Sequence, residues 1–223
     1  MRAVRSMVSS LGTASLTMIM SALVVPVGAT TSAVKPLSAA ERTLLRAAIT
    51  QTLSAESVRV DVTWQSAGMT RYLLLKRPDQ MRTETVLPDG TALSALAIGR
   101  DNYESTTSVP RRWVHSRSVR TPAGVFDATL QPWLQVDLFT HHDGDRFVGE
   151  VVSRRTRFEV RAQLRGGYVV GIDLAAVAGQ KSVAPMNSRL RLSRFGQRLS
   201  ITTPPVNQID ELLGPMNRRR QST

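Results

Sequence analysis

The sequence contains no cysteine, and this absence removes several kinds of chemistry at once. Disulfide bonds, thiolate metal sites, cysteine nucleophiles and lipid attachment through cysteine are all excluded. Histidine is scarce, with 3 residues in 223, and aromatic residues make up only 5% of the chain. Function therefore has to be sought in charge, in the spacing of apolar residues and in turn signals.

Lysine is also rare: 26 of the 29 basic residues are arginine, and the formal net charge is +12. Such a balance favours partners of negative charge, such as anionic lipid, anionic polymer or nucleic acid. Nucleic acid fits poorly, because the arginines are spread through predicted strands rather than gathered on one helix and aromatic residues are few. We expect no nucleic-acid partner.

The N-terminus has the pattern of a secretory signal peptide. Arg2 and Arg5 precede an uncharged, mostly apolar stretch at residues 11–25, and Pro26 is followed by Val27-Gly28-Ala29 at the usual cleavage spacing. The stretch is shorter than the roughly 20 residues of a spanning helix, which favours cleavage over a retained anchor. We predict a signal peptide at 1–29, a linker at 30–37, one domain at 38–215, a basic disordered tail at 216–223, and a location in the periplasm or extracellular cell envelope.

The spacing of apolar residues changes from helical to strand-like early in the domain. Ser38 and Glu41 form a capping box, which predicts a helix to about residue 53. Valines then alternate with polar residues from Val58 to Val62, as in a half-buried strand. Turn signals follow about every 10 residues and predict an antiparallel meander. Its further strands are expected at 69–76, 80–86, 91–98, 103–107 and 111–117.

A second helix is predicted to interrupt the meander. Asp127 can cap a helix over residues 128–141. Strands are then expected at 147–153, 156–165, 168–176, 188–195 and 199–202, with a closing helical turn at 209–213. A sheet of this size has to curl. The predicted fold class is α+β, with a curved antiparallel β-sheet that forms an unclosed half-barrel and with helices covering its concave face.

Four stretches carry a likeness to a known family. They are residues 72–82 ahead of Asp89-Gly90, residues 98–103 followed by Arg112-Trp113-Val114, residues 167–170, and residues 189–205. In this order they resemble the LolA/LppX-type lipid and lipoprotein carriers of bacterial envelopes, over most of the chain after Ser38. The resemblance implies a LolA-like half-barrel with a hydrophobic cavity under a helical lid, which carries acyl chains between membrane surfaces without catalysis. Many such relatives begin the mature chain with a lipid-bearing cysteine, which this chain lacks.

The alternating apolar residues are candidates for the inner face of the half-barrel. Alternation fits a packed core as well as a ligand cavity, and the resemblance favours a cavity for the set rather than for each member. The candidate cavity lining consists of Val58, Val60, Val62, Trp64, Phe158, Val160, Leu164, Leu190 and Leu192. The candidate lid residues are Leu130, Trp133, Leu134 and Leu138.

Arginines occupy the opposite phase of the same strands. The candidates for contact with an anionic membrane surface are Arg157, Arg161, Arg165, Arg189 and Arg191. A solvated face that prevents edge aggregation is the commoner use of such residues. Attraction to anionic headgroups, worth about 1 kcal/mol per basic residue near the membrane, is the functional alternative. The cluster Arg218-Arg219-Arg220 leaves the same alternatives, with a frayed tail favoured.

Metal and catalytic signals are weak. His141, His142, Asp143 and Asp145 form the only metal-like cluster, but Asp-Gly-Asp suits a turn, and neither the calcium-loop nor the zinc-helix pattern is met. No nucleophile elbow, phosphate loop or dinucleotide fingerprint occurs. We expect a structural turn here, with no metal, no cofactor and no enzyme activity.

These observations lead to three hypotheses. The first is an exported, monomeric carrier that holds a lipid, or the acyl part of a lipoprotein, in a hydrophobic half-barrel cavity. The second is an envelope sensor or protein-interaction module on the same scaffold with an envelope protein as partner, although related regulators usually have an added domain. The third is a structural domain, which predicts no cavity beyond ordinary packing defects.

Overall fold

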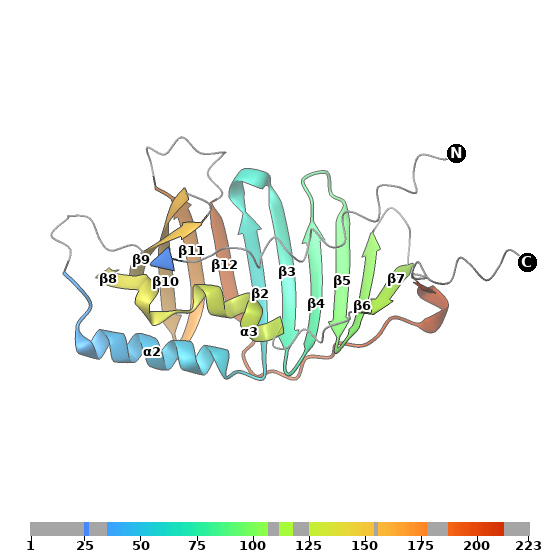
Figure 1. The fold of residues 1–223 in the computed structure, drawn as a ribbon, viewed down its shortest axis with the longest axis horizontal. Helices are drawn as coiled ribbons and strands as arrows, with labels where there is room; N and C mark the ends of the chain where they lie inside the picture. Colours follow the sequence, from blue (N-terminus) through green and yellow to red (C-terminus); the bar gives the residue numbers. More distant parts are fainter. Residues whose placement is uncertain are drawn as a thin grey trace, which may run out of the picture.

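The computed structural model describes residues 25–26, 35–106, 112–117, 125–153, 156–177 and 187–211. Within these ranges the chain forms one large, unclosed and mainly antiparallel sheet of 13 strands with few helices. Figure 1 shows the strands in a long row, with helices in front of one half of it. The basic tail and, apart from two residues, the predicted signal peptide lie outside the described residues.

The first half of the chain folds as a helix followed by a meander, as predicted. The capping box is confirmed, because the Ser38 hydroxyl accepts from the Glu41 N–H at 3.3 Å and the Glu41 carboxylate accepts from the Ser38 N–H at 2.6 Å. Each strand of the meander pairs antiparallel with the next. The elements are α2 (Ala39–Leu53), β2 (Ser57–Trp64), the 3-10 turn η1 (Gln65–Ala67), β3 (Met69–Lys76), β4 (Gln80–Val86), β5 (Ala92–Ile98), β6 (Asp101–Thr106) and β7 (Trp113–Arg117).

The predicted second helix over residues 128–141 is wrong. The chain forms α3 (Val125–Leu130), the 3-10 turns η2 (Gln131–Trp133) and η3 (Val136–Leu138), and then the strand β8 (Phe139–Asp143). Pro132 has no N–H for the helical ladder and disfavours helical dihedrals in the residue before it, so the α-helix ends at Leu130. His142 then lies opposite Phe147 in the next strand, and its neighbour His141 lies opposite Val148.

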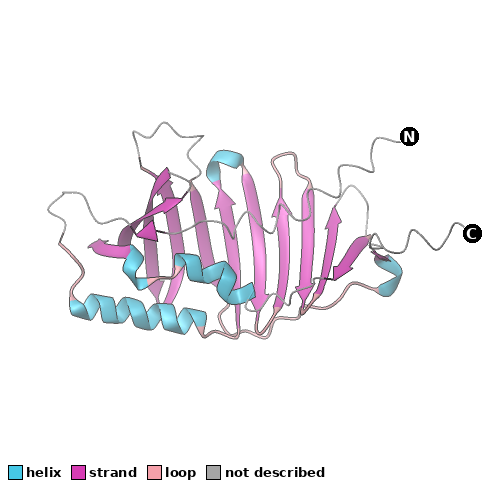
Figure 2. Cartoon of the chain, viewed as in Figure 1, coloured by secondary structure: helices cyan, strands magenta, loops and turns pink. Residues whose placement is uncertain are grey.

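The remaining strands join the two halves of the chain into one sheet. They are β9 (Arg146–Ser153), β10 (Thr156–Arg165), β11 (Tyr168–Ala176) and β12 (Ser188–Ser193). Because β12 pairs with β2, the C-terminal hairpins continue the N-terminal meander, and strands dominate the view in Figure 2. The short strand β1 (Val25–Pro26), from within the predicted signal peptide, pairs with Val151 and Val152 at the edge of β9.

The C-terminal segment differs from its prediction in three places. The strand expected at 188–195 ends at Ser193, because Arg194 has a left-handed φ of 56°. Residues 199–202 form no strand, and the expected helical turn from residue 209 is instead the 3-10 turn η4 (Val206–Gln208) and the strand β13 (Ile209–Glu211). After β12 the chain crosses the ends of the strands, and β13 pairs parallel with β7 at the far edge (Figure 1). Tertiary contacts there override the local helical pattern.

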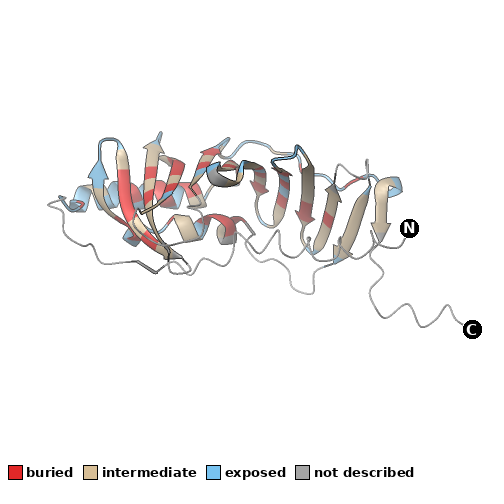
Figure 3. Cartoon of the chain, turned by 90° about the horizontal axis from the view of Figure 1, so that it is seen from above, coloured by how far each residue is buried: buried red, intermediate tan, exposed pale blue. Residues whose placement is uncertain are grey.

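Buried residues lie on both faces of the sheet. We call the face that carries Val58, Val60 and Val62 the helix face, because side chains of α2 and α3 pack against it in the main hydrophobic cluster. A smaller cluster around Leu96 and Tyr103 lies on the opposite, outer face, beneath Ile201 of the C-terminal segment. Figure 3 shows that buried residues are most frequent in the half of the sheet near the helices.

Close contact between the segment before β8 and strand β9 depends on a residue without a side chain. A Cβ atom on Gly149 would lie 1.6 Å from the Leu138 carbonyl oxygen, which is part of the backbone. A Cβ atom on Gly171 would instead meet the guanidinium end of Arg191 at 2.2 Å, and that flexible side chain can move away. The two glycines therefore differ in what a methyl group would displace.

Substitution of these glycines tests the placement of this segment. Gly149→Ala is expected to lower the free energy of unfolding by about 3 kcal/mol, because backbone has to shift. Gly171→Ala is the matched control and should cost less than about 1 kcal/mol, because only Arg191 moves. Urea unfolding of both variants measures the difference, and equal costs would show that the segment does not lie on Gly149.

Candidate functional site

The nine predicted lining residues come together on the helix face. Val62 and Val60 of β2 lie opposite Leu190 and Leu192 of β12. All nine either belong to the main hydrophobic cluster or pack against it. The buried members are Val58, Val60, Val62, Val160, Leu190 and Leu192, and the partly buried ones are Trp64, Phe158 and Leu164.

The predicted lid residues pack on this face of the sheet. Leu130, Leu134 and Leu138 are buried in the same cluster, and Trp133 packs against it. From α2, the buried Leu45, Ala48 and Ile49 join them.

Beneath this cover the packing is tight. Val58, Val160 and Leu130 expose 0% of their surface, so they contact no space that water can enter. A hydrocarbon chain could reach them only after a helix moves away, and the roles of lining and lid stay predictions.

Beyond β2 the helix face becomes polar at one level, while Leu73 and Leu75 of β3 continue the hydrophobic cluster at the neighbouring levels. Val62 lies opposite Arg71 of β3, which in turn lies opposite Thr85 of β4. Arg71, Thr83 and Thr85 are all buried. Polar side chains on the buried side of a sheet are uncommon without a partner or a function.

Arg71 was not among the residues singled out from the sequence. It is 7% exposed, its Nε donates to the Thr85 hydroxyl at 2.8 Å, and its guanidinium lies 5.4 Å from the centre of the Trp64 ring. Burial lowers the pKa of Arg71. A signal was available, because residue 71 has the same alternation phase as Leu73 and Leu75 and is the charged member of an apolar series.

Glu104 lies on the same face, on β6. It is two strands from Thr83 through Ala95. Burial raises the pKa of Glu104, because a half-desolvated carboxylate is disfavoured relative to the neutral acid.

Arg77, in the turn between β3 and β4, ties the two helices to the sheet. Its guanidinium contacts both carboxylate oxygens of Asp127 in α3, at 2.7 and 3.3 Å, and lies 4.4 Å from the centre of the Phe126 ring. It also donates to the backbone carbonyls of Leu53, the last residue of α2, and Ala55. We call this group the Arg77 clamp. A cation suits the C-terminal carbonyls of a helix and a bidentate carboxylate alike.

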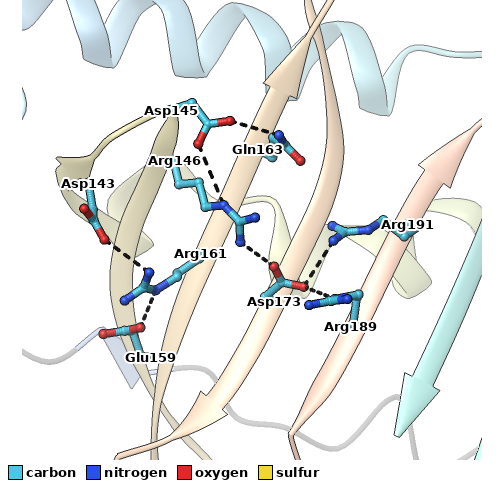
Figure 4. Close-up of polar contacts among 9 residues, drawn as sticks. All are labelled: Asp143, Asp145, Arg146, Glu159, Arg161, Gln163, Asp173, Arg189 and Arg191. Carbon is cyan, nitrogen blue, oxygen red and sulfur yellow. Dashed lines mark hydrogen bonds and ion pairs between the residues drawn. The ribbon is translucent and has the colours of Figure 1, made fainter. Parts of the chain in front are cut away.

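The predicted membrane-facing arginines lie on the outer face, where most of them already contact carboxylates. Arg161 lies between Glu159 at 2.5 Å and Asp143 at 3.1 Å, and the hydrogen bond to Glu159 raises the pKa of Arg161 (Figure 4). Arg157 lies 3.7 Å from Glu150. Arg165 is exposed beside the Gly166-Gly167 turn.

Asp173 is the centre of a second group on this face. Figure 4 shows Arg146, Arg189 and Arg191 directed at its carboxylate, at 2.6, 2.9 and 3.8 Å. Surface pairs of this kind contribute little singly and more as a network. An anionic headgroup would have to share these guanidiniums with the protein's own carboxylates, and the membrane contact stays a prediction.

The metal-like cluster of the sequence is a hairpin turn. His141, His142 and Asp143 lie in β8, and Gly144 has a left-handed φ of 62° before Asp145. Asp143 pairs with Arg161 and Asp145 accepts from Gln163 at 2.9 Å, so the carboxylates hold neighbouring strands (Figure 4). In the described part of the chain, no group of three or more His, Asp or Glu side chains is arranged to hold a metal ion.

Comparisons with known proteins give a limited result. No protein-family model matches the chain, and no curated protein matches it in sequence. Among solved structures, the crystal structure of LprF from Mycobacterium bovis is similar, with a TM-score of 0.49 and 12% sequence identity. The match covers 76% of this chain and 99% of that one. At this level of similarity the LolA/LppX resemblance stays a prediction.

The described helices were also compared with the requirements of a membrane span. None of them is long and apolar enough to cross a bilayer.

The Arg77 clamp can be tested by removing one charge. Asp127→Asn should lower the free energy of unfolding by about 1 kcal/mol, because a bidentate charge pair in a half-exposed position is lost. Hydrogen exchange should become faster at residues 126–138 and remain unchanged in β10 and β11. Asp137→Asn, which removes an exposed charge from the first turn of η3, is the matched control. Unchanged exchange in α3 would show that the clamp does not hold it.

The raised pKa of Glu104 predicts that removing its charge increases stability in a pH-dependent way. Because its folded pKa is raised above the unfolded value, its ionisation opposes folding, not at all below the unfolded pKa and increasingly as pH rises towards the folded pKa. Glu104→Gln should therefore raise the thermal unfolding midpoint at neutral pH and leave it unchanged below about pH 4. Glu84→Gln, on the exposed phase of β4, should show no such pH-dependent gain. An equal gain at both pH values would contradict the role of burial.

Proposed function

We propose that the chain is an exported, non-enzymatic carrier that holds the acyl chains of a lipid or lipoprotein against the helix face of a curved half-barrel. The observation that carries this proposal is the continuous aliphatic surface of β2, β10, β11 and β12, which α2 and the short segment from α3 to η3 cover in the described part of the chain. In this proposal the helix face is the concave face, the helices are its cover, and the carrier works as a monomer in the cell envelope.

Energetics favour a cover that can be exchanged for a ligand. Burial of hydrocarbon contributes about 0.8 kcal/mol per methylene group, so an acyl chain can replace the contacts that the cover gives up. A helix of six residues, such as α3, has little stability of its own and depends on packing. Displacing it therefore loses contacts but little intrinsic helical stability.

The Arg77 clamp sets how easily the cover opens. It joins the end of α2, the turn after β3 and the start of α3 through one side chain. Because the Arg77 and Asp127 side chains are about one-third exposed, water can reach and compete for the pair. We propose that α3 leaves first, with Arg77 retaining its bonds to the end of α2.

The outer-face arginines have a secondary role in this proposal. Long-range attraction of a strongly basic chain to an anionic bilayer raises the rate of encounter, while the acyl contacts supply the affinity.

Three tryptophans provide natural probes for the site of an acyl chain. Trp64 and Trp133 pack against the main cluster on the helix face, whereas Trp113 packs in the smaller cluster on the outer face. We expect lipids with brominated acyl chains to quench the fluorescence of single-tryptophan proteins that retain Trp64 or Trp133, and to leave the Trp113 protein unquenched. The other two tryptophans are replaced by Phe in each protein.

Alternative outcomes separate the competing functions. Equal quenching of all three proteins would indicate adsorption to lipid surfaces rather than a carrier site. No quenching, together with no lipid bound to the native protein in mass spectrometry, would exclude an acyl carrier. In that case, capture of one envelope protein would favour the sensor hypothesis.

A further inference from the structure

A row of paired residues crosses the helix face. The row is apolar as far as β2 and polar from β3 onward. The row runs through β9, β10, β11, β12, β2, β3 and β4 at one level, with each residue directly opposite the next. Its members are Phe147, Ala162, Ile172, Leu190, Val62, Arg71 and Thr85, and all seven are buried. Five apolar side chains are thus followed by a guanidinium and a hydroxyl.

The apolar part of this row has the length of an acyl chain. From β9 to β2 there are four strand spacings, or about 19 Å. That is comparable to an extended fatty acyl chain. A chain that lies along the row under the cover would place its polar end one strand further on, beside Arg71.

We propose that Arg71, Thr83 and Thr85 bind the phosphate headgroup of the acylated ligand at this border. The inference rests on the proposed carrier function and adds the class of headgroup. The guanidinium offers a fork of donors that matches phosphate oxygens, and the two threonine hydroxyls on β4 lie on the same face as further donors.

Burial makes this position favourable for an anion. Attraction between a cation and an anion grows as water is excluded, and Arg71 is almost fully desolvated. Burial lowers the pKa of Arg71, because the charged form has lost contact with water. An arriving phosphate would offset the desolvation of Arg71.

Acidic groups on the same face are distant or engaged. Glu104 on β6 is three strand spacings from Arg71, or about 14 Å, and burial raises its pKa. Asp210 in the edge strand β13 pairs with Arg112, which lowers the pKa of Asp210.

The experiment uses two ligands that differ only in the phosphate. The purified full chain is incubated with vesicles that contain equal amounts of phosphatidic acid and diacylglycerol with identical acyl chains, in a phosphatidylcholine host of another chain length. Native mass spectrometry then reads the ratio of bound lipids by mass. We expect phosphatidic acid to be preferred by roughly ten- to a hundredfold, as for a charge-assisted hydrogen-bonded pair.

Three single-residue variants test which side chains cause the preference for phosphatidic acid. Arg71→Gln should abolish it while acyl binding continues, and Thr85→Val, which keeps the guanidinium, should reduce it. Arg82→Gln removes an exposed charge from the opposite face of β4 and should leave the preference intact. The unfolding midpoint of each variant confirms that it is folded.

Each contrary outcome has a separate meaning. Equal uptake of the two lipids, or a preference that survives in both Arg71→Gln and Thr85→Val, overturns the headgroup site and leaves the acyl carrier standing. Failure to bind either lipid overturns the carrier function, and the headgroup site with it. An Arg71-dependent rise in the unfolding midpoint with millimolar inorganic phosphate alone would assign the site to free phosphate, and would overturn the lipid headgroup.

Discussion

The structure depends on keeping one broad aliphatic surface out of water. Strands β2, β10, β11 and β12 present much of it on the same face, and within the described residues α2 and the segment from α3 to η3 lie on it. The sheet's own hydrogen bonds run within its plane and cannot protect that face.

The cover combines strong packing with modest attachment. Leu45 of α2, Leu130 of α3 and Leu138 of η3 are buried as deeply as the strand residues of the same cluster. Yet the polar attachment at the turn after β3 relies on Arg77, whose partners come from both helices. A cover held chiefly by hydrocarbon contacts can be replaced by hydrocarbon, and this equivalence underlies the proposed function. At the level of Val62, the buried Arg71 and Thr85 then follow the apolar side chains, so this one row has an apolar part and a charged end.

Local chemistry predicted much of this fold, and long-range contacts account for most of the differences. The capping box at Ser38 and the strands of the meander could be read directly, because caps, turns and alternation are local signals. Pro132 was a visible reason to end the second helix early. Arg77 could not be recognised, because its partner Asp127 is 50 residues away. Strand β13 likewise depends on contact with β7. The position of Arg71 in the row can be recognised only once strand pairing shows which residues lie opposite it.

The crossing segment after β12 has a consequence for how the molecule can move. Ser57 at the start of β2 holds it through the backbone of Gly196 and Gln197, Ile201 is buried against the outer face, and β13 closes the far edge. The crossing segment therefore holds the part of the sheet near β7, and its contacts lie on the outer face, away from the helices. Opening at one end need not loosen the other. In the proposed carrier, the cover would move while this fastened part of the sheet keeps its shape through each cycle of loading and release.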